Sequence, residues 1–136
     1  MLLVDGQGVP VACRTASASP GVSSLVEDLA AEVTVVGGQI PRIADRAHDR
    51  DPHRVKLKDR GFDLVCPHRR GRKCPRTQDG RKSRRYTRRW KIERTISWLG
   101  NNRRSLVRHE RHIYIFHGFI VLACIMLCLK RFGHGL

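Results

Sequence analysis

The stretch from Tyr86 to Gly100 reads YTRRWKIERTISWLG and contains no glycine or proline before its last residue. Ile92, Ile96 and Leu99 recur at spacings of four and three, which predicts an amphipathic helix that packs on a sheet. Because a helix repeats every 3.6 residues, a polar stripe should lie beside this apolar face. The stripe contains Tyr86, Arg89, Glu93, Ser97, Gly100 and Arg104, and Leu106 extends the apolar face.

Glu93 is the only acid between Asp79 and Glu110. One interpretation is an ion pair with Arg89 at the i, i+4 spacing on a solvated helix, worth about 0.2–0.5 kcal/mol. The other is a carboxylate that carries out chemistry beside a packed helix face. Spacing alone favours the ion pair.

Positive charge is concentrated around the start of this helix. The 136 residues contain 27 Lys and Arg against 12 Asp and Glu, a net charge of +15, and residues 69–94 alone hold 13 Lys and Arg against two acids. Gly71, Pro75 and Gly80 predict a loop through Arg85, hereafter the basic loop (residues 69–85). Such cations neutralise DNA phosphates and read little sequence. We therefore expect DNA contacts from Arg69, Arg70, Arg72, Lys73, Arg81, Lys82, Arg84, Arg85, Arg88, Arg103 and Arg104.

The first 66 residues alternate strand-like and helix-like segments, which predicts an α/β layer. In chain order we expect a hairpin around Asp5-Gly6-Gln7-Gly8, a helix over Val22–Ala31, a short apolar run Ile43-Ala44 ending at Asp45, a helix over Pro52–Asp59 with Asp51 as its N-cap, and a strand over Phe62–Cys66.

The segment from Ile113 to Leu129 is apolar on nearly every face, which is typical of a helix central to a core or in a membrane. Its length of about 25 Å falls short of a hydrocarbon layer of about 30 Å. We expect a core helix, with a membrane span as the alternative.

The stretch YTRRWKIERTISWL, followed by RRSLVRHER, resembles the C-terminal signature of bacterial insertion-sequence transposases of the DDE type, the insertion-sequence-five group. That signature is Tyr, two residues, Arg, three residues, Glu, six residues, then Lys or Arg. Tyr86, Arg89 and Glu93 fit it. Gly100 stands where the basic residue is expected, so that role is absent or shifted to Arg103 or Arg104.

The segment ADRAHD resembles the motif that bears the second catalytic Asp of these transposases, which places that role at Asp45. His48 stands where the family commonly has Tyr. The segments CPHRRGRK, TQDGRK and VDGQGVP also look like this group, so the resemblance covers nearly the whole chain.

The resemblance implies a ribonuclease-H-like fold, in which helices flank a mixed sheet and three carboxylates converge at one edge. Asp45 and Glu93 would be catalytic residues and ligands of Mg²⁺ or Mn²⁺, supported by Tyr86 and Arg89. Two such ions about 3.5–4 Å apart activate the attacking hydroxyl and stabilise the leaving oxygen in phosphoryl transfer.

The resemblance implies a third carboxylate on a first strand, and we expect this chain to begin at the second strand. The turn around Asp5 explains that acid without a catalytic role. We therefore expect a single partial domain over residues 1–136, an incomplete ribonuclease-H-like α/β fold without its first strand. Its parts are a sheet and helix part (1–66), a basic segment (67–85) and C-terminal helices (86–131).

The predicted function is that of the C-terminal part of a Mg²⁺-dependent transposase, inactive alone and located in the bacterial cytoplasm. Its expected partners are element-end and target DNA, with a missing N-terminal segment or a second copy of the chain. The alternatives are a non-catalytic nucleic-acid-binding protein and a small membrane protein anchored by Ile113–Leu129. A zinc site at Cys66, His68 and Cys74 lacks a fourth ligand and the paired spacing of structural zinc modules. The five cysteines show no disulfide framework, which favours a reducing compartment.

Overall fold

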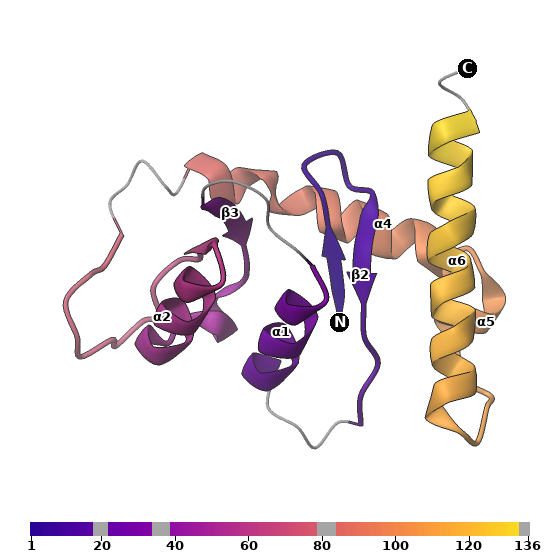
Figure 1. The fold of residues 1–136 in the computed structure, drawn as a ribbon, viewed down its shortest axis with the longest axis horizontal. Helices are drawn as coiled ribbons and strands as arrows, with labels where there is room; N and C mark the ends of the chain where they lie inside the picture. The colour runs from indigo at the N-terminus through magenta and orange to yellow at the C-terminus, as the bar shows by residue number, and fades with distance from the viewer. Residues whose placement is uncertain (18–21, 34–38, 79–83, 134–136) are drawn as a thin grey trace. The chain divides into compact units, whose positions relative to one another are not determined.

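The computed structural model describes residues 1–17, 22–33, 39–78 and 84–133. The chain forms two units, residues 1–18 with 90–136 and residues 19–89. The first unit contains β1 (Leu2–Val4), β2 (Pro10–Cys13), α4 (Trp90–Gly100), α5 (Arg103–Leu106) and α6 (Ile113–Gly133) (Figure 1). The second contains α1 (Val22–Ala31), β3 (Ile40–Ile43), the 3₁₀ turn η1 (Arg46–His48), α2 (Asp51–Asp59), β4 (Phe62–Val65) and the 3₁₀ turn η2 (Thr87–Arg89).

The predicted hairpin is confirmed, because β1 and β2 pair antiparallel across the turn that begins at Asp5. The Asp5 carboxylate accepts hydrogen bonds from the backbone amides of Gln7 and Val9, each at 2.8 Å. Gly8 has a φ of +86°, a conformation that L side chains rarely adopt. The structure therefore gives Asp5 the turn role that the sequence predicts for it.

Side chains of helix α4 donate hydrogen bonds to backbone carbonyls of this turn. Lys91 Nζ donates to the Gly6 carbonyl, Arg94 Nη2 donates to that of Gln7 at 3.3 Å, and Thr95 Oγ1 donates to that of Gly8 at 2.7 Å. Thr95 is fully buried. Polar side chains thus hold the helix to the hairpin turn, in addition to the apolar cluster of Leu99 with Leu2 and Cys13.

The prediction for the apolar face of α4 was wrong in part. Leu99 is buried, but Ile96 is 54% exposed and Leu106 is 69% exposed. The hydrogen bonds to the turn bring the Lys91 and Thr95 side of the helix inward, which leaves Ile96 outside.

Helix α4 ends at Gly100, as predicted, although the predicted polar stripe continues to Arg104. The amides of Asn101 and Asn102 donate to the carbonyls of Trp98 and Leu99, which closes a tight turn after Gly100. Ser105 Oγ, on α5, accompanies this turn by donating to the Asn102 carbonyl at 2.8 Å. The expected polar stripe therefore stops at Gly100, and Arg104 lies on α5, a separate helix.

Helix α6 covers the predicted segment and continues to Gly133, but it is not a buried core helix. Only Ala123 and Cys124 are buried among its described side chains, where they join Leu99 in a small core. Phe132 is 68% exposed. By length and composition alone, α6 could cross a membrane.

In the second unit, β3 and β4 pair in parallel, from Ile40 opposite Phe62 to Ile43 opposite Val65. Helix α2 packs on β4, and α1 packs beside α2 (Figure 1). The apolar core between them consists of Val26, Ala30, Leu57, Phe62, Leu64 and Cys66. The predicted α/β class is confirmed, and these small sheets and helices fit part of a ribonuclease-H-like fold. A single mixed sheet without its first strand, within one partial domain, stays a prediction.

The predicted N-cap of α2 was wrong by one residue. The helix begins at Asp51 and Arg50 is its N-cap, without a capping hydrogen bond from its side chain. Pro52 still lies in the first turn, as its fixed φ and missing amide proton favour. The Asp51 carboxylate, in the first turn of the helix, binds Arg72 Nη2, at 2.6 and 2.7 Å.

We predict that Thr95→Val lowers the free energy of unfolding by about 1–3 kcal/mol, because it leaves the buried Gly8 carbonyl without its donor. Urea denaturation of the full chain measures this loss. Ser97→Ala, at an exposed position of the same helix, is the matched control and should change it by less than about 0.5 kcal/mol. Equal effects of the two substitutions would contradict the fastening role of Thr95.

Candidate functional site

Asp45 lies two residues after β3, at the carboxyl end of the parallel pair. Its Oδ1 accepts a hydrogen bond from the Ala47 amide at 2.9 Å, and its carbonyl accepts one from His48 at 3.2 Å. Its side chain is 45% exposed. Within the described residues, Asp45 Oδ2 makes no hydrogen bond. The carboxylate is therefore fixed by one oxygen and open at the other.

The side chain of His48 is close to that of Asp45, since its Nε2 lies 3.6 Å from Asp45 Oδ1. The residue is buried, and this burial lowers the pKa of His48, while the charge of Asp45 opposes the effect only in part. His48 is therefore a neutral ring at pH 7. In this state it contacts the carboxylate without a strong ion pair.

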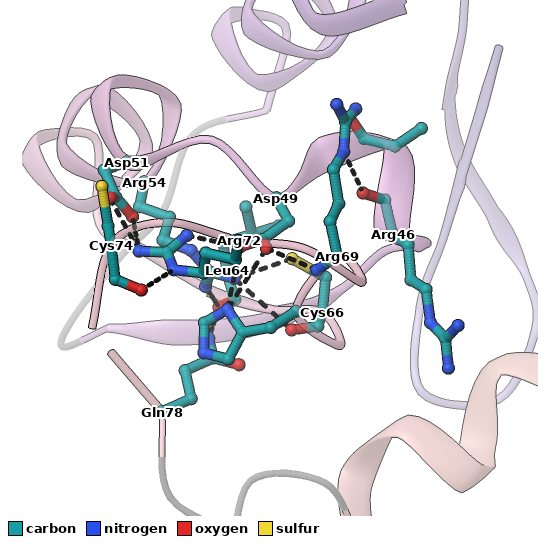
Figure 2. A network of polar contacts seen from close by, with 12 residues as sticks. Arg46, Asp49, Asp51, Arg54, Leu64, Cys66, Arg69, Arg72, Cys74 and Gln78 are labelled. Atoms are coloured by element: carbon teal, nitrogen blue, oxygen red, sulfur yellow. Dashed lines mark hydrogen bonds and ion pairs between the residues drawn. The ribbon is translucent and has the colours of Figure 1, made fainter. Parts of the chain in front are cut away.

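Asp49 is the centre of a polar network (Figure 2). Its side chain is 1% exposed. Its Oδ1 accepts from Arg54 Nη2 at 2.8 Å and Arg72 Nη1 at 3.2 Å, and it lies 3.1 Å from His68 Nδ1. Its Oδ2 accepts from the Arg69 amide at 2.8 Å. One carboxylate thus joins η1, α2 and the start of the basic loop.

The charge of Asp49 is strongly stabilised. Burial by itself would raise the pKa of this carboxyl, but the hydrogen bonds from Arg54, the Arg69 amide and His68 outweigh burial and lower the pKa to about 2. The ionised form is therefore the one that holds the network together at neutral pH.

The network also fixes the beginning of the basic loop. Arg72 Nε donates to the carbonyls of Cys74 and Pro75, each at 3.2 Å, in addition to its bonds with Asp49 and Asp51. Gln78 Nε2 donates to the Leu64 carbonyl (Figure 2). The loop up to Gln78 is thus anchored to the α/β unit.

The three residues considered for zinc have other surroundings. Cys66 Sγ accepts from Arg54 Nη2 at 2.9 Å, and burial raises the pKa of Cys66 to about 11, so the thiol is protonated at pH 7. His68 faces Asp49, and Cys74 is exposed. Across the described parts of the chain, no three His, Cys, Asp or Glu side chains are grouped to hold a metal ion.

The predicted DNA contacts fall into different environments. Arg72 is largely internal, whereas Arg69, Arg70, Lys73, Arg84, Arg85 and Arg88 are exposed. Arg81 and Lys82 lie outside the described residues. Arg103 and Arg104 line an open hollow of about 430 Å³ with His109, and Arg104 Nη1 binds Glu110 Oε1 at 2.9 Å.

The three residues of the resembling signature divide between the units. Arg89 Nη1 donates to the Tyr86 hydroxyl at 2.9 Å, so the structure brings these two together in the second unit. Glu93 is exposed in the first turn of α4, in the first unit. The shared metal site of Glu93 and Asp45 stays a prediction.

Both tryptophans of α4 carry arginine side chains on their rings. The Arg94 guanidinium lies 4.6 Å from the Trp90 ring centre and 4.7 Å from that of Trp98, and Arg131 lies 4.7 Å from Trp98. These are cation–π distances. Both rings therefore have arginine partners within the chain, although Trp90 is 51% exposed.

Sequence reasoning missed Asp49. The segment ADRAHDRD contains three acids, and the motif resemblance draws attention to the first of them. The arginines and the histidine that follow Asp49 in the sequence are a signal for a buried ion-pair cluster. Only the fold shows that Arg54, His68 and Arg72 are the ones that meet this carboxylate.

Comparisons with known proteins agree on one relationship. The sequence profile of the family described as "Transposase DDE domain" matches residues 1–129. The protein named "Putative transposase for insertion sequence element IS402", from Burkholderia cepacia, is 32% identical over 135 residues. This alignment covers 93% of the present chain and 60% of that relative, so the chain spans less than two thirds of its length. No solved structure gives a significant match.

We predict that Asp49→Asn lowers the free energy of unfolding by about 3–5 kcal/mol at pH 7, because it leaves buried cations without their partner. In the parent, the stabilisation from ionised Asp49 should be complete above about pH 4. It should be lost as the pH falls toward 2, since the folded pKa lies below the ordinary value of 3.8.

Urea denaturation between pH 2 and pH 6 measures this dependence as the difference between parent and variant. Asp59→Asn, at an exposed position on α2, is the control and should follow the parent. If the curves of Asp49→Asn and the parent run parallel over this range, Asp49 does not hold the network by its charge.

Proposed function

The chain belongs to the transposase DDE domain family of bacterial insertion sequences, and on that premise we propose that it acts in DNA transposition. In this proposal it is the C-terminal part of a metal-dependent enzyme that binds, cuts and joins DNA. Asp45 and Glu93 are its catalytic carboxylates, and Tyr86 and Arg89 support them. The observation that carries the proposal is the family match over residues 1–129, which includes both carboxylates.

The surroundings of Asp45 suit a divalent cation such as Mg²⁺ or Mn²⁺. These ions prefer carboxylate oxygens and keep several water ligands, so a half-exposed carboxylate with one open oxygen fits them. Glu93 is exposed and lies between Ile92 and Arg94 on a helix that is fastened to the hairpin. Bound there, such ions would activate a hydroxyl and stabilise the leaving oxygen at a DNA phosphate.

Exposed cations of the basic loop suit the DNA backbone. Arg70, Lys73 and Arg76 are exposed beside the anchored Arg72, so their charges are held near the carboxyl end of β4 without an internal partner of opposite charge among the described residues. Such charges position a duplex by its phosphates. The basic loop thus brings DNA to the unit that carries Asp45.

We assign the chain to the insertion-sequence-five group on the spacing of Tyr86, Arg89 and Glu93, with Gly100 as its departure. We also propose that the chain alone does not cleave DNA, because two carboxylates fall short of the family's three. A third would come from another transposase segment or from a second copy. The protein would work in the bacterial cytoplasm, and the family match through residue 129 favours this over a membrane role for α6.

We predict that the affinity of the chain for duplex DNA falls steeply between about 50 and 200 mM salt, because each neutralised phosphate adds about 0.9 to the slope of log K against log salt. The double substitution of Arg70→Gln and Lys73→Gln should lower this slope by about 2. Fluorescence anisotropy with a labelled duplex measures it. Lys58→Gln, an exposed cation on α2, is the control and should leave the slope unchanged. Binding that does not change over this salt range would refute the phosphate contacts.

We predict that the chain joined to the part of the Burkholderia cepacia relative outside the alignment nicks supercoiled plasmid in Mg²⁺, whereas the chain alone does not. In the joined protein, Asp45→Asn and Glu93→Gln should each lower the rate at least about 100-fold, because each removes a metal ligand. Asp59→Asn is the control.

Two results would contradict this account. Nicking by the chain alone that Glu93→Gln abolishes would show that two carboxylates suffice. If Asp45→Asn and Glu93→Gln each leave the nicking rate of the joined protein unchanged, Asp45 and Glu93 hold no metal.

A further inference from the structure

Arg69 turns back toward the Asp45 turn, although it lies in the basic loop and is exposed. Its Nε donates to the Arg46 carbonyl at 3.0 Å, and its Nη2 donates to the Ala47 carbonyl at 2.6 Å (Figure 2). Both carbonyls belong to η1, the turn that Asp45 begins. The planar guanidinium, with its fixed fork of donors, satisfies two adjacent carbonyls at once.

The two ends of this turn are thus closed by different side chains. Asp45 Oδ1 accepts from the Ala47 amide, and Arg69 donates to the Arg46 and Ala47 carbonyls. The Arg69 backbone is itself fixed, because its amide donates to the buried Asp49 carboxylate at 2.8 Å. Arg69 is therefore held at its backbone while its side chain holds the turn.

We propose that Arg69 is a positioning residue that holds the Asp45 carboxylate in place, rather than one of the phosphate contacts of the basic loop. The inference rests on the proposed function in that Asp45 is taken to bind a metal ion. A ligand must be held within about 0.5 Å by supporting contacts, and a three-residue turn with an exposed carboxylate has few of its own. Arg69 supplies them from across the fold.

The neighbouring Arg70 provides a matched comparison. It is exposed, it carries the same charge, and its side chain makes no hydrogen bond or ion pair within the described residues. If both arginines bound phosphate, their substitutions would act alike. The proposal predicts that they act differently.

The first measurement is amide hydrogen exchange by NMR on the full chain, at Ala47, His48 and Asp49, whose amides bond within the turn. Arg69→Gln should speed their exchange about tenfold, as expected for the loss of hydrogen bonds from a charged donor. Arg70→Gln should leave the rates within about twofold. Arg69→Lys, which keeps a charged donor, should give rates between those of the parent and Arg69→Gln, and it decides the matter if Arg69→Gln does not fold.

The second measurement uses Mn²⁺ alone as the probe. The Mn²⁺ concentration that half-broadens the Ala47 amide signal should rise about tenfold in Arg69→Gln and stay within about twofold in Arg70→Gln. In DNA binding, Arg70→Gln should lower the salt slope by about 1 and Arg69→Gln by clearly less.

Parent-like exchange rates and a parent-like Mn²⁺ midpoint in both Arg69 variants would overturn the proposal. So would a fall of the salt slope by about 1 in Arg69→Gln without a change in exchange. If the parent itself shows no Mn²⁺ broadening near Asp45, the metal role in the proposed function fails. The exchange rates then decide alone whether Arg69 holds the turn.

Discussion

The buried carboxylate of Asp49 accepts hydrogen bonds from α2 and from the segment after β4, and this constraint organises the second unit. Arg54 comes from α2, and His68, Arg69 and Arg72 come from the segment after β4. A charge removed from water is stable only when it is paired and hydrogen-bonded. The chain between Asp45 and Arg72 therefore has few other ways to fold while that carboxylate stays buried.

In the proposed enzyme, the Asp49 network would support both the DNA contacts of the basic loop and the Asp45 carboxylate. The basic loop, which would contact DNA, starts at the residue whose guanidinium holds the Asp45 turn. The same carboxylate fixes the Arg69 amide and pairs with Arg72. Phosphate contacts and a metal-binding carboxylate would thus share one rigid support. In the first unit, Thr95 fixes the helix that carries Glu93, because its hydroxyl donates a hydrogen bond to the Gly8 carbonyl of the hairpin turn.

The hairpin turn, helix α1 and the strand end before Asp45 could be predicted, because the signal for each lies in residues close together in the sequence. The hairpin turn needs a positive φ at Gly8 and the carboxylate of Asp5, which accepts two of its amides, and the helical spacing over Val22–Ala31 was sufficient for α1. The position of Asp45 at a strand end also followed from a short apolar run. Each of these depends on residues fewer than ten positions apart.

Contacts across the fold could not be predicted. A helix pattern shows which residues are apolar, but not that Thr95 would be buried on a carbonyl while Ile96 stays exposed. Net charge identified the basic loop without showing that Arg72 is used internally and Arg69 turns toward η1. Composition likewise does not show that most side chains of α6 are not buried, because their burial depends on which other residues pack against the helix.

The central claim is that Asp45 and Glu93 bind the same divalent metal site, and a Mn²⁺ titration read at both residues tests it most directly. The claim predicts that the amide signals of Asp45 and Glu93 broaden with one midpoint, and that Asp45→Asn abolishes the broadening at Glu93 as well. Broadening at Glu93 that persists in Asp45→Asn, or broadening at only one of the two residues in the parent, would contradict it.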